Sequence, residues 1–577
     1  MCGIFGFTNF KKQDLEQARD SLHTLHHRGP DQWNDYYNEN IYMGHQRLSI
    51  LDLSDHGKQP MIDPAGNVII TVNGEIYNFL EIKKELESKY NFNSTSDSEV
   101  VLYGYMEWGI DKLLEKIDGM YAISIYDRKN NLLYLARDRV GIKPLFFGVL
   151  NNQISWASEL KAIQKLYENE NILNYDYTAF YDFLTYRYVP TPKTIYKNIF
   201  KLEPAHLLKI DTKTNTFEKT QYWQLEIRTC DDDIETAKKK IYKLVEKSVD
   251  EQMVADVPVG FFLSGGMDSS TIVALASNNH TDINTFSIGF EDNSRDETHF
   301  AELVADMYKT KHHKKILDEN IINEMFHKII EWYDEPCALS SSYPNYLVSK
   351  LARENSIVVL TGDGGDEVFG GYNWYKTFQR LKKHSTPFFR FLRPLLQMLQ
   401  KRNVFRRISR KLETSFLLDD LEIYTKLMSG MLKDQKEKYK DLWGIDKDYD
   451  DYWYFRKHYR EEFDYYTKLQ YLDFHTFLPD ACLSKVDRTS MSVSLECRVP
   501  LLSKEIIEYS FSLKDEIRIY NCELKGVMKE AFRKILPNEI LERDKKGFSA
   551  PLKSVFEMLE LNSGTLQEKY LNRYWNI

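Results

Sequence analysis

Short apolar runs separated by polar turns dominate the first 150 residues of the chain. Each run is apolar or alternates apolar with polar residues, and Gly, Asn or Asp bounds it, which is typical of strands. The predicted strands cover 68–72, 121–126, 132–136 and 145–150. Two other stretches, 13–25 and 80–89, have the spacing of helices. The pattern predicts a layered α+β unit without regular βαβ alternation.

A different pattern begins near residue 235. A helical stretch at 236–250 precedes a continuous apolar run at 257–263, a Gly-rich turn and a helix from Ser269. Further predicted strands at 284–290 and 357–360 alternate with predicted helices at 297–308 and 343–354. This alternation predicts a doubly wound parallel sheet, an α/β unit. The proline-containing stretch 160–235 resembles a bridge, and the chain after about 375 is mostly helical and rich in aromatic residues.

Composition narrows the class of protein. The chain has 577 residues, 42% of them hydrophobic, and a net charge of −9, which indicates a multidomain globular protein and argues against nucleic acid as the main partner. Six cysteines without a CxxC pair indicate neither a disulfide scaffold nor a zinc site. The first residues do not resemble a signal peptide, and no apolar run approaches 18 residues. We expect an enzyme of the reducing cytoplasm.

Cys2 is the first residue with chemical potential. Removal of Met1 would expose it as the N-terminal residue, and its own α-amino group, with an ordinary pKa of about 7.7–8.0, could then serve as the base. A thiol and a base within one residue need no distant histidine. The alternative for an isolated Cys2 is a buried cysteine near the start of a strand.

Four polar motifs follow Cys2 along the predicted α+β unit. They are HRGPD with Arg28, RLSI with Arg47, NGEIYN with Asn73, Gly74 and Glu75, and SDSE with Asp97. Together they supply a cation for a carboxylate, an amide and a backbone N–H for an oxyanion, and carboxylates for an ammonium group. These groups suit a free amino acid whose side-chain amide is cleaved by a thiol. For Arg28, an ion pair that locks the turn is the alternative role.

These segments resemble the class II glutamine amidotransferases, which are N-terminal-nucleophile glutaminases. The resemblance covers residues 1 to about 165 and includes MCGIFGF, HHRGPD, RLSI, VNGEIYN, TSDSE and ARDRVGIKPLFF. It implies an αββα sandwich in which Cys2 attacks glutamine, and Asn73 with the Gly74 backbone N–H forms the oxyanion hole. It further implies a glutamine site formed by Arg47, Leu48, Ser49, Ile50, Leu51, Asn73, Gly74, Glu75 and Asp97.

A Gly-rich loop follows the apolar run at 257–263. Its sequence, Ser264-Gly265-Gly266-Met267-Asp268-Ser269-Ser270, combines glycines and hydroxyls with the N-terminus of a helix, which favours anion binding. Asp268 within such a loop suggests that Mg²⁺ bridges it to phosphate. The loop lacks the Gly-Lys-Ser/Thr ending of a Walker A motif. The alternative is a structural strand-to-helix turn.

Three later blocks complete the second pattern. TGDGGDE at 361–367 follows another apolar run, SKVDRTSM at 484–491 carries Lys485, and LECRVP spans 495–500. If the first of these blocks lies beside the 264–270 loop in a parallel sheet, both face one ligand crevice.

SGGxDS resembles the loop of ATP pyrophosphatases, and all blocks in this order resemble the glutamine-hydrolysing asparagine synthetases. That resemblance implies a glutaminase domain at 1–210 and a synthetase domain at 211–577. It implies that ATP, glutamine and aspartate react through an acyl-adenylate, with ammonia passing through an internal tunnel. It assigns Lys485 to transition-state stabilisation and Asp268 and Asp366 to Mg²⁺. The implied ATP site contains Phe262, Leu263, Ser264, Gly265, Gly266, Asp268, Ser269, Ile288, Thr361 and Gly362.

Two features depart from that resemblance. Asp363 stands where the well-studied members have a glutamate that is proposed to act as a base, and this difference leaves another acceptor, such as a sugar acid, open. Residues 380–411 contain eleven Lys or Arg and no Asp or Glu, for which we favour a helical insertion over a membrane-surface element. Neither the oligomeric state, with a homodimer as one option, nor the gating of the tunnel follows from the sequence.

Overall fold

The computed structural model describes residues 2–170, 172–291, 296–317, 331–384 and 419–543, together with positions 325, 328, 567–568, 571–572 and 575. Most of the basic segment 380–411, and with it the question of an insertion or a membrane-surface element, lies outside the described residues.

The N-terminal unit contains two six-stranded antiparallel sheets. The first sheet has the order β10-β8-β9-β1-β3-β2, and the second has the order β12-β11-β7-β6-β5-β4. The strands of the first sheet are β1 (Cys2–Thr8), β2 (Gln32–Tyr37), β3 (Ile41–Arg47), β8 (Phe146–Leu150), β9 (Gln153–Ala157) and β10 (Ile199–Lys201). Those of the second are β4 (Met61–Ile62), β5 (Val68–Ile76), β6 (Gly119–Asp127), β7 (Leu132–Arg137), β11 (His206–Asp211) and β12 (Thr216–Gln221).

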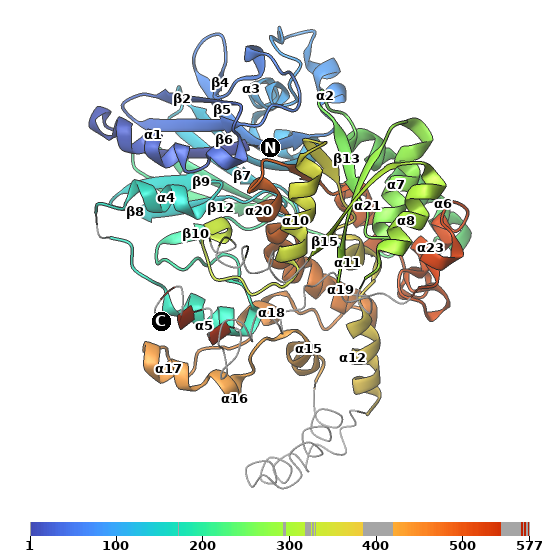
Figure 1. The fold of residues 1–577 in the computed structure, drawn as a ribbon. Coiled ribbons are helices and arrows are strands. Elements are labelled where there is room, and N and C mark those ends of the chain that lie inside the picture. Colours follow the sequence, from blue (N-terminus) through green and yellow to red (C-terminus); the bar gives the residue numbers. More distant parts are fainter. Residues whose placement is uncertain are drawn as a thin grey trace.

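Three apolar layers hold this unit together. Ile4, Met43, Ile69 and Leu135 belong to the core between the two sheets. Outside the first sheet, α1 (Leu15–His23) and α4 (Leu160–Leu166) pack on β1, β3, β8 and β9. Outside the second sheet, α2 (Phe79–Leu86) and α3 (Glu99–Lys116) share a core with β5 and β6. The order of layers is therefore αββα, as the resemblance implied (Figure 1).

The second unit is built on a five-stranded sheet of order β15-β14-β13-β16-β17, in which every described pairing is parallel. Its strands are β13 (Val259–Phe262), β14 (Asn284–Phe290), β15 (Lys311–Leu317), β16 (Val358–Leu360) and β17 (Glu496–Arg498). Its helices are α6 (Ile234–Gln252), α7 (Met267–Asn279), α8 (Thr298–Tyr308), α10 (Ser342–Arg353) and α11 (Gly365–Phe369). Figure 1 shows this unit, green to red, beside the blue sandwich.

Mostly helical segments complete the molecule. The bridge contributes α5 (Tyr177–Tyr186). The C-terminal part contributes α12 (Asn373–His384), α15 (Asp420–Met428), α16 (Lys433–Lys436), α17 (Lys438–Trp443), α18 (Trp453–His458), α19 (Tyr465–His475), α20 (Ser484–Met491), α21 (Lys504–Ser512), α22 (Asp515–Arg518), α23 (Gly526–Phe532) and α24 (Asn538–Leu541). A π-helical turn, Leu478–Leu483, runs directly into α20. The three predicted parts of the fold, sandwich, parallel sheet and helical region, are thus confirmed.

The division at residue 210 stays a prediction, because the pairing of β11 with β12 continues the second sheet across it to Gln221.

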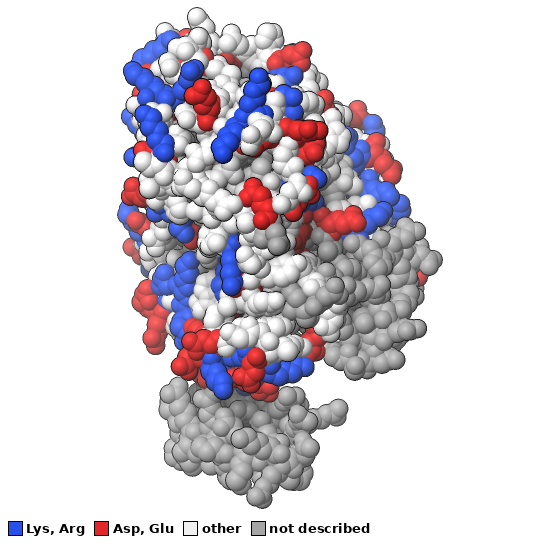
Figure 2. All heavy atoms as spheres, turned by 90° about the vertical axis from the view of Figure 1, so that its left-hand side faces the viewer, with Lys and Arg blue, Asp and Glu red and all other residues white. Residues whose placement is uncertain are grey.

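Among the described residues, no helix is long and apolar enough to cross a membrane. On the face shown in Figure 2, Lys and Arg are interspersed with Asp and Glu.

Candidate functional site

The nucleophile predicted from the sequence lies at the start of a central strand. Cys2 pairs with Arg47 in the antiparallel register of β1 and β3. Only 7% of Cys2 is exposed, and its backbone N–H donates to Asn73 Oδ1 at 3.0 Å. Burial raises the pKa of the Cys2 thiol above its usual value, against the opposing effect of a hydrogen bond from the Leu48 backbone. The thiol therefore needs a base to become the nucleophilic thiolate.

The predicted oxyanion-hole residues lie on β5, beside the nucleophile. Asn73 Nδ2 donates to Ser158 Oγ at 3.3 Å, and this hydroxyl also accepts from the Ile4 N–H at 3.0 Å. The Asn73 amide is thus held between β1 and the residue after β9. Gly74 has φ +152°, and a Cβ there would lie 1.9 Å from the Met120 carbonyl oxygen. Only glycine fits this close approach of β5 to β6.

Arg47 holds the loop that follows β3. Its Nη1 donates to Gln32 Oε1 and to the Ser54 carbonyl, both at 2.9 Å, and its Nη2 donates to the carbonyls of Leu51 and Asp52. In this state its terminal nitrogens are therefore engaged by the protein. Leu48 and Ile50 are buried in a core shared with the second unit, whereas the Ser49 N–H donates to Asp31.

The predicted acidic pair, Glu75 and Asp97, is buried near the end of β5. Burial raises the pKa of Asp97 to about 6, although the Ile76 N–H donates to its carboxylate at 2.7 Å. Burial and the neighbouring carboxylates of Glu496 and Asp97 also raise the pKa of Glu75. Arg498, on β17 of the other unit, lies 3.2 Å from Glu75 and 2.7 Å from Glu496. The second unit therefore completes the surroundings of the first site.

Arg28 joins the two units directly. Its Nε donates to the Cys2 carbonyl at 3.1 Å, and its Nη1 lies 2.8 Å from both Glu159 and Asp487. Its side chain is fully buried. The geometry agrees with an ion-pair role, but the partner Asp487 lies 459 residues away on α20. No motif signals this pairing, since nothing in HRGPD or SKVDRTSM identifies the other segment.

A large pocket opens at the carboxyl ends of the parallel strands, with a volume of about 890 Å³. It is lined by nine of the ten predicted ATP-site residues and by Asp363, Asp366 and Lys485. The tenth, Gly265, has φ +68° and lies against Phe300, where a Cβ would be 2.5 Å from the Phe300 Cβ. Its role is thus to let the loop approach α8.

The two predicted metal-binding carboxylates converge on one cation of the protein. Lys525 Nζ lies 2.6 Å from an oxygen of Asp268 and 2.6 Å from Asp366 Oδ1. Two carboxylates at one point beside an anion-binding loop fit Mg²⁺, which takes few protein ligands when phosphates supply others. Among the described residues, no group of three or more His, Cys, Asp or Glu forms a closed metal site. Sequence reasoning missed Lys525, since no motif marks it.

The reacting end of the pocket contains Lys485 and Asp363. Their charged atoms lie 3.4 Å apart, and Thr361 Oγ1 donates to the other oxygen of Asp363 at 2.6 Å. Burial alone would lower the pKa of Lys485, but the charge and hydrogen bond of Asp363, together with Cys482 and Glu367, raise that pKa. Glu367, also missed, accepts from Tyr372 Oη and from the Cys482 thiol, the latter at 3.3 Å. Carboxylates and a fixed cation thus line the same wall.

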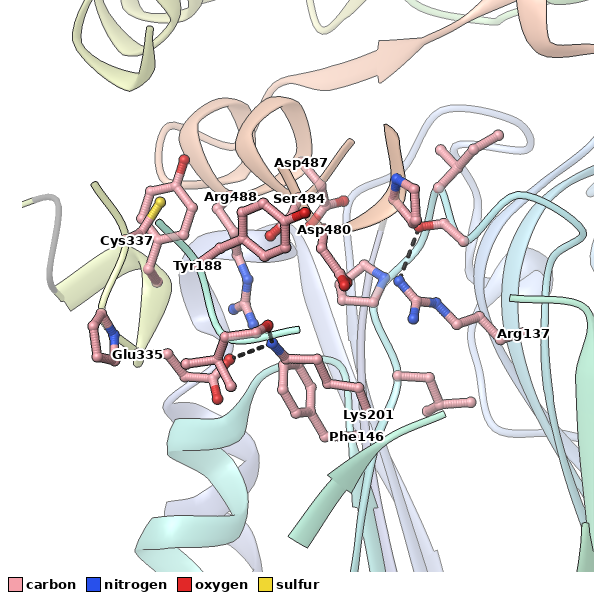
Figure 3. Close-up of a pocket in the computed structure, with 18 residues that line it drawn as sticks. Arg137, Phe146, Tyr188, Lys201, Glu335, Cys337, Asp480, Ser484, Asp487 and Arg488 are labelled. Carbon is pink, nitrogen blue, oxygen red and sulfur yellow. Dashed lines mark hydrogen bonds and ion pairs between the residues drawn. The ribbon is translucent and has the colours of Figure 1, made fainter. Parts of the chain in front are cut away.

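A second, much smaller cavity of about 40 Å³ lies between the units (Figure 3). In Figure 3 Lys201 and Glu335 lie below the cavity, Arg137 lies to its right, and Asp487 and Arg488 of α20 lie above it. Lys201 is paired with Glu335 at 2.8 Å, and Arg488 with Glu159 at 3.1 Å. The cavity is part of the charged interface and is too small for an organic substrate.

Comparison with known proteins gives two family matches. Residues 1–223 match the glutamine amidotransferase domain model, and residues 240–572 match the asparagine synthase model. Asparagine synthetase [glutamine-hydrolyzing] 1 of Bacillus subtilis is 32% identical, over 100% of this chain and 91% of that protein. Asparagine synthetase [glutamine-hydrolyzing] 3 of the same organism is 30% identical, over 95% and 87%. The glutamine PRPP amidotransferase structure from B. subtilis covers 63% of this chain and 82% of its own, at 14% identity and a TM-score of 0.31.

Proposed function

Because this chain belongs to the asparagine synthase family, we propose that it makes asparagine from aspartate, with ATP as the activating substrate and glutamine as the nitrogen donor. The products are asparagine, glutamate, AMP and pyrophosphate. The observation that carries the proposal is the pairing of a buried N-terminal cysteine site with a pocket that combines an anion-binding loop, converging carboxylates and Lys485.

The first half-reaction is hydrolysis of the glutamine amide. The Cys2 thiol gives its proton to its own α-amino group, freed by removal of Met1, and the thiolate attacks the amide carbon. Asn73 and the Gly74 N–H stabilise the oxyanion. The α-ammonium group returns its proton to the departing nitrogen, ammonia leaves, and water then hydrolyses the thioester to glutamate and the free thiol. Arg47 binds the carboxylate of glutamine when one of its hydrogen bonds to a loop carbonyl is replaced by one to the substrate. Glu75 and Asp97 bind the ammonium group of glutamine.

The second half-reaction makes the aspartate β-carboxylate reactive. The carboxylate attacks the α-phosphorus of ATP, pyrophosphate leaves, and ammonia then displaces AMP from the acyl-adenylate. Mg²⁺ held by Asp268 and Asp366 would supply positive charge beside the phosphates. Lys485 balances negative charge on the α-phosphate, and Asp363 takes a proton from the attacking nitrogen.

Ammonia needs a dry path between the sites. Leu48, Ile50, Met120 and Ile142 of the glutaminase unit share one apolar core with Leu263, Val368 and Leu501 of the synthetase unit. A neutral molecule can cross such an interface, whereas an ammonium ion pays a large desolvation cost. We further propose division into 1–210 and 211–577, a cytoplasmic location and no nucleic-acid partner; a homodimer stays a prediction.

The test is transfer of labelled nitrogen. Purified protein receives amide-¹⁵N glutamine, aspartate and Mg·ATP, with and without a tenfold excess of unlabelled ammonium. We expect equimolar AMP, pyrophosphate and asparagine, and we expect the asparagine to keep most of the label despite the competitor. Pyrophosphate formation with a uronic acid and none with aspartate would replace the proposed acceptor. Full dilution of the label would refute the internal path.

A further inference from the structure

The large pocket contains more cations than the phosphates of ATP account for. Lys485 faces Asp363, Lys525 faces Asp268 and Asp366, and Arg543 faces Glu297. Lys529 and Arg533 are paired with Glu523 and Glu530. Arg187 and Lys376 also line the pocket, and the described residues offer neither of them a carboxylate partner. A cation in a ligand pocket without a carboxylate is available to an anionic ligand.

Arg187 is the more firmly placed of these two. It follows α5 with φ 71° and ψ 3°, and its N–H donates to the Phe183 carbonyl. Glycine is the usual residue in this left-handed conformation at a helix end, so the long side chain is kept at a local cost. Lys376 lies on α12, and both side chains are exposed.

The side chain of Arg187 is contacted on one side by Ser429 and Gly430. Its Nη2 donates to the Ser429 carbonyl at 3.4 Å, and a Cβ at Gly430 would come within 3.1 Å of Arg187 Cγ. Neighbouring atoms exclude water and lower the pKa of the guanidinium below its usual value. The side chain as a whole is exposed, so an anion that enters the pocket can reach the guanidinium.

The backbone of Arg187 also positions a second polar segment. Its carbonyl accepts from the Ala338 N–H at 2.9 Å, and Ser340 and Ser341, which follow in sequence, line the same pocket. A guanidinium and two hydroxyls that line one pocket supply the donors that a carboxylate accepts from.

We propose that Arg187 binds the second carboxylate of the acceptor, the one that is not activated, and thereby selects dicarboxylic amino acids such as aspartate over monocarboxylates. The assignment rests on the proposed function. It divides the pocket into an end for the nucleotide at the Gly-rich loop and an end for the acceptor at the bridge between the units. A residue of the bridge thus determines the specificity of the synthetase.

The test uses ammonia as the nitrogen source, so that the glutaminase site is not involved. Pyrophosphate release is measured at saturating ATP while aspartate is varied, for the parent and for Arg187→Gln. Loss of a charge-assisted contact should raise the KM for aspartate roughly 10- to 100-fold. The KM for ATP should change less than about threefold. The rate with 3-aminopropanoate, which is aspartate without its α-carboxylate, should be poor in the parent and not fall further.

Three variants keep the outcome decisive. Arg187→Gly relieves the left-handed backbone, so it should unfold at an equal or higher urea concentration while showing the same KM defect. Lys309→Gln removes another cation at a left-handed helix end, outside the pocket, and should leave the KM unchanged. Lys376→Gln tests the other unpaired cation.

The results separate the two proposals. An unchanged KM for aspartate in Arg187→Gln, or the defect appearing in Lys376→Gln alone, overturns the Arg187 assignment and leaves asparagine synthesis intact. A parent protein that turns over a monocarboxylate and ignores aspartate overturns both the acceptor and the assignment. Equal losses with aspartate and 3-aminopropanoate would mean that Arg187 does not read the second carboxylate.

Discussion

The two proposed sites of this molecule are built in opposite ways. Around Cys2, which is only 7% exposed, every predicted polar side chain that the structure buries already has a protein partner. The synthetase pocket is wide, with about 890 Å³ of space. A site that must release ammonia without losing it benefits from closure, whereas a site that admits ATP and an acceptor needs room. Glu75 and Arg28 of the first site pair with Arg498 and Asp487 of the second unit, so the closure of that site depends on the interface.

The largest effect should come from the nucleophile of the closed site. Cys2→Ala should lower glutamine-dependent asparagine formation by roughly 10⁴-fold or more, since no other thiol can replace it. Ammonia-dependent formation should stay within about twofold, because the wide pocket is untouched. Both rates are measured as AMP release with each nitrogen source.

Cys230→Ala is the matched control, since Cys230 is a free cysteine packed between Ser512 and the start of α6. It should leave both rates unchanged. If ammonia failed to rescue Cys2→Ala, the two sites would not be separate.

The corresponding substitution in the synthetase pocket is Asp268→Asn. Asp268→Asn should reduce AMP formation with either nitrogen source by on the order of 10²- to 10³-fold, because it removes one of two carboxylates proposed to hold Mg²⁺. Glutamine hydrolysis without ATP should persist. Titration of AMP formation with Mg²⁺ should show a raised requirement for the metal.

Asp268→Asn replaces the carboxylate with an amide of nearly the same shape, so a general packing defect is not expected. Retained AMP formation at ordinary Mg²⁺ would contradict the metal role of Asp268. Parallel loss of glutamine hydrolysis would show that the pocket governs the closed site.

The third prediction concerns the interface between the two units, where Arg28 pairs with Asp487. Asp487→Asn removes the charge that Arg28 and Lys143 share, at 2.8 Å and 3.8 Å. Breaking a buried ion pair by removing one partner should cost about 3 kcal/mol or more, measured as a lower urea midpoint of unfolding. Because Arg28 also holds the Cys2 carbonyl, glutamine hydrolysis should fall more than ammonia-dependent synthesis.

The matched control is an exposed pair on α6. Lys238→Gln breaks the pair with Glu235; the Lys238 side chain is 28% exposed and the Glu235 side chain 61%. This substitution should change the free energy of unfolding by less than about 1 kcal/mol. Equal effects of the two substitutions would mean that the Arg28–Asp487 pair does not hold the units together.

Much of this comparison could be predicted from the sequence, but not its interface. Local patterns predicted β5, β6, β14 and α10 within a few residues, because period and turn residues are local properties. The motifs also identified Asp268, Asp363 and Lys485, since each belongs to a short block. Arg498, Asp487, Lys525 and Arg187 were missed, because their roles depend on contacts between distant segments. The carbonyl contacts of Arg47 were missed for the same reason.

The smallest predicted effect is one of pH, and it also separates the sites. Asp97 must be ionised to hold the ammonium group of glutamine, and burial raises its pKa to about 6. As pH falls through that value Asp97 takes up a proton, so kcat/KM for glutamine in the free enzyme should fall up to tenfold per pH unit. The effect of Asp97 on this rate should become level about one pH unit above that value. Ammonia-dependent synthesis, expressed against free NH₃, should show no break near pH 6 from this cause. Asp97→Asn should have low glutamine activity at every pH and lose the break; a break that survives the substitution would belong to another group.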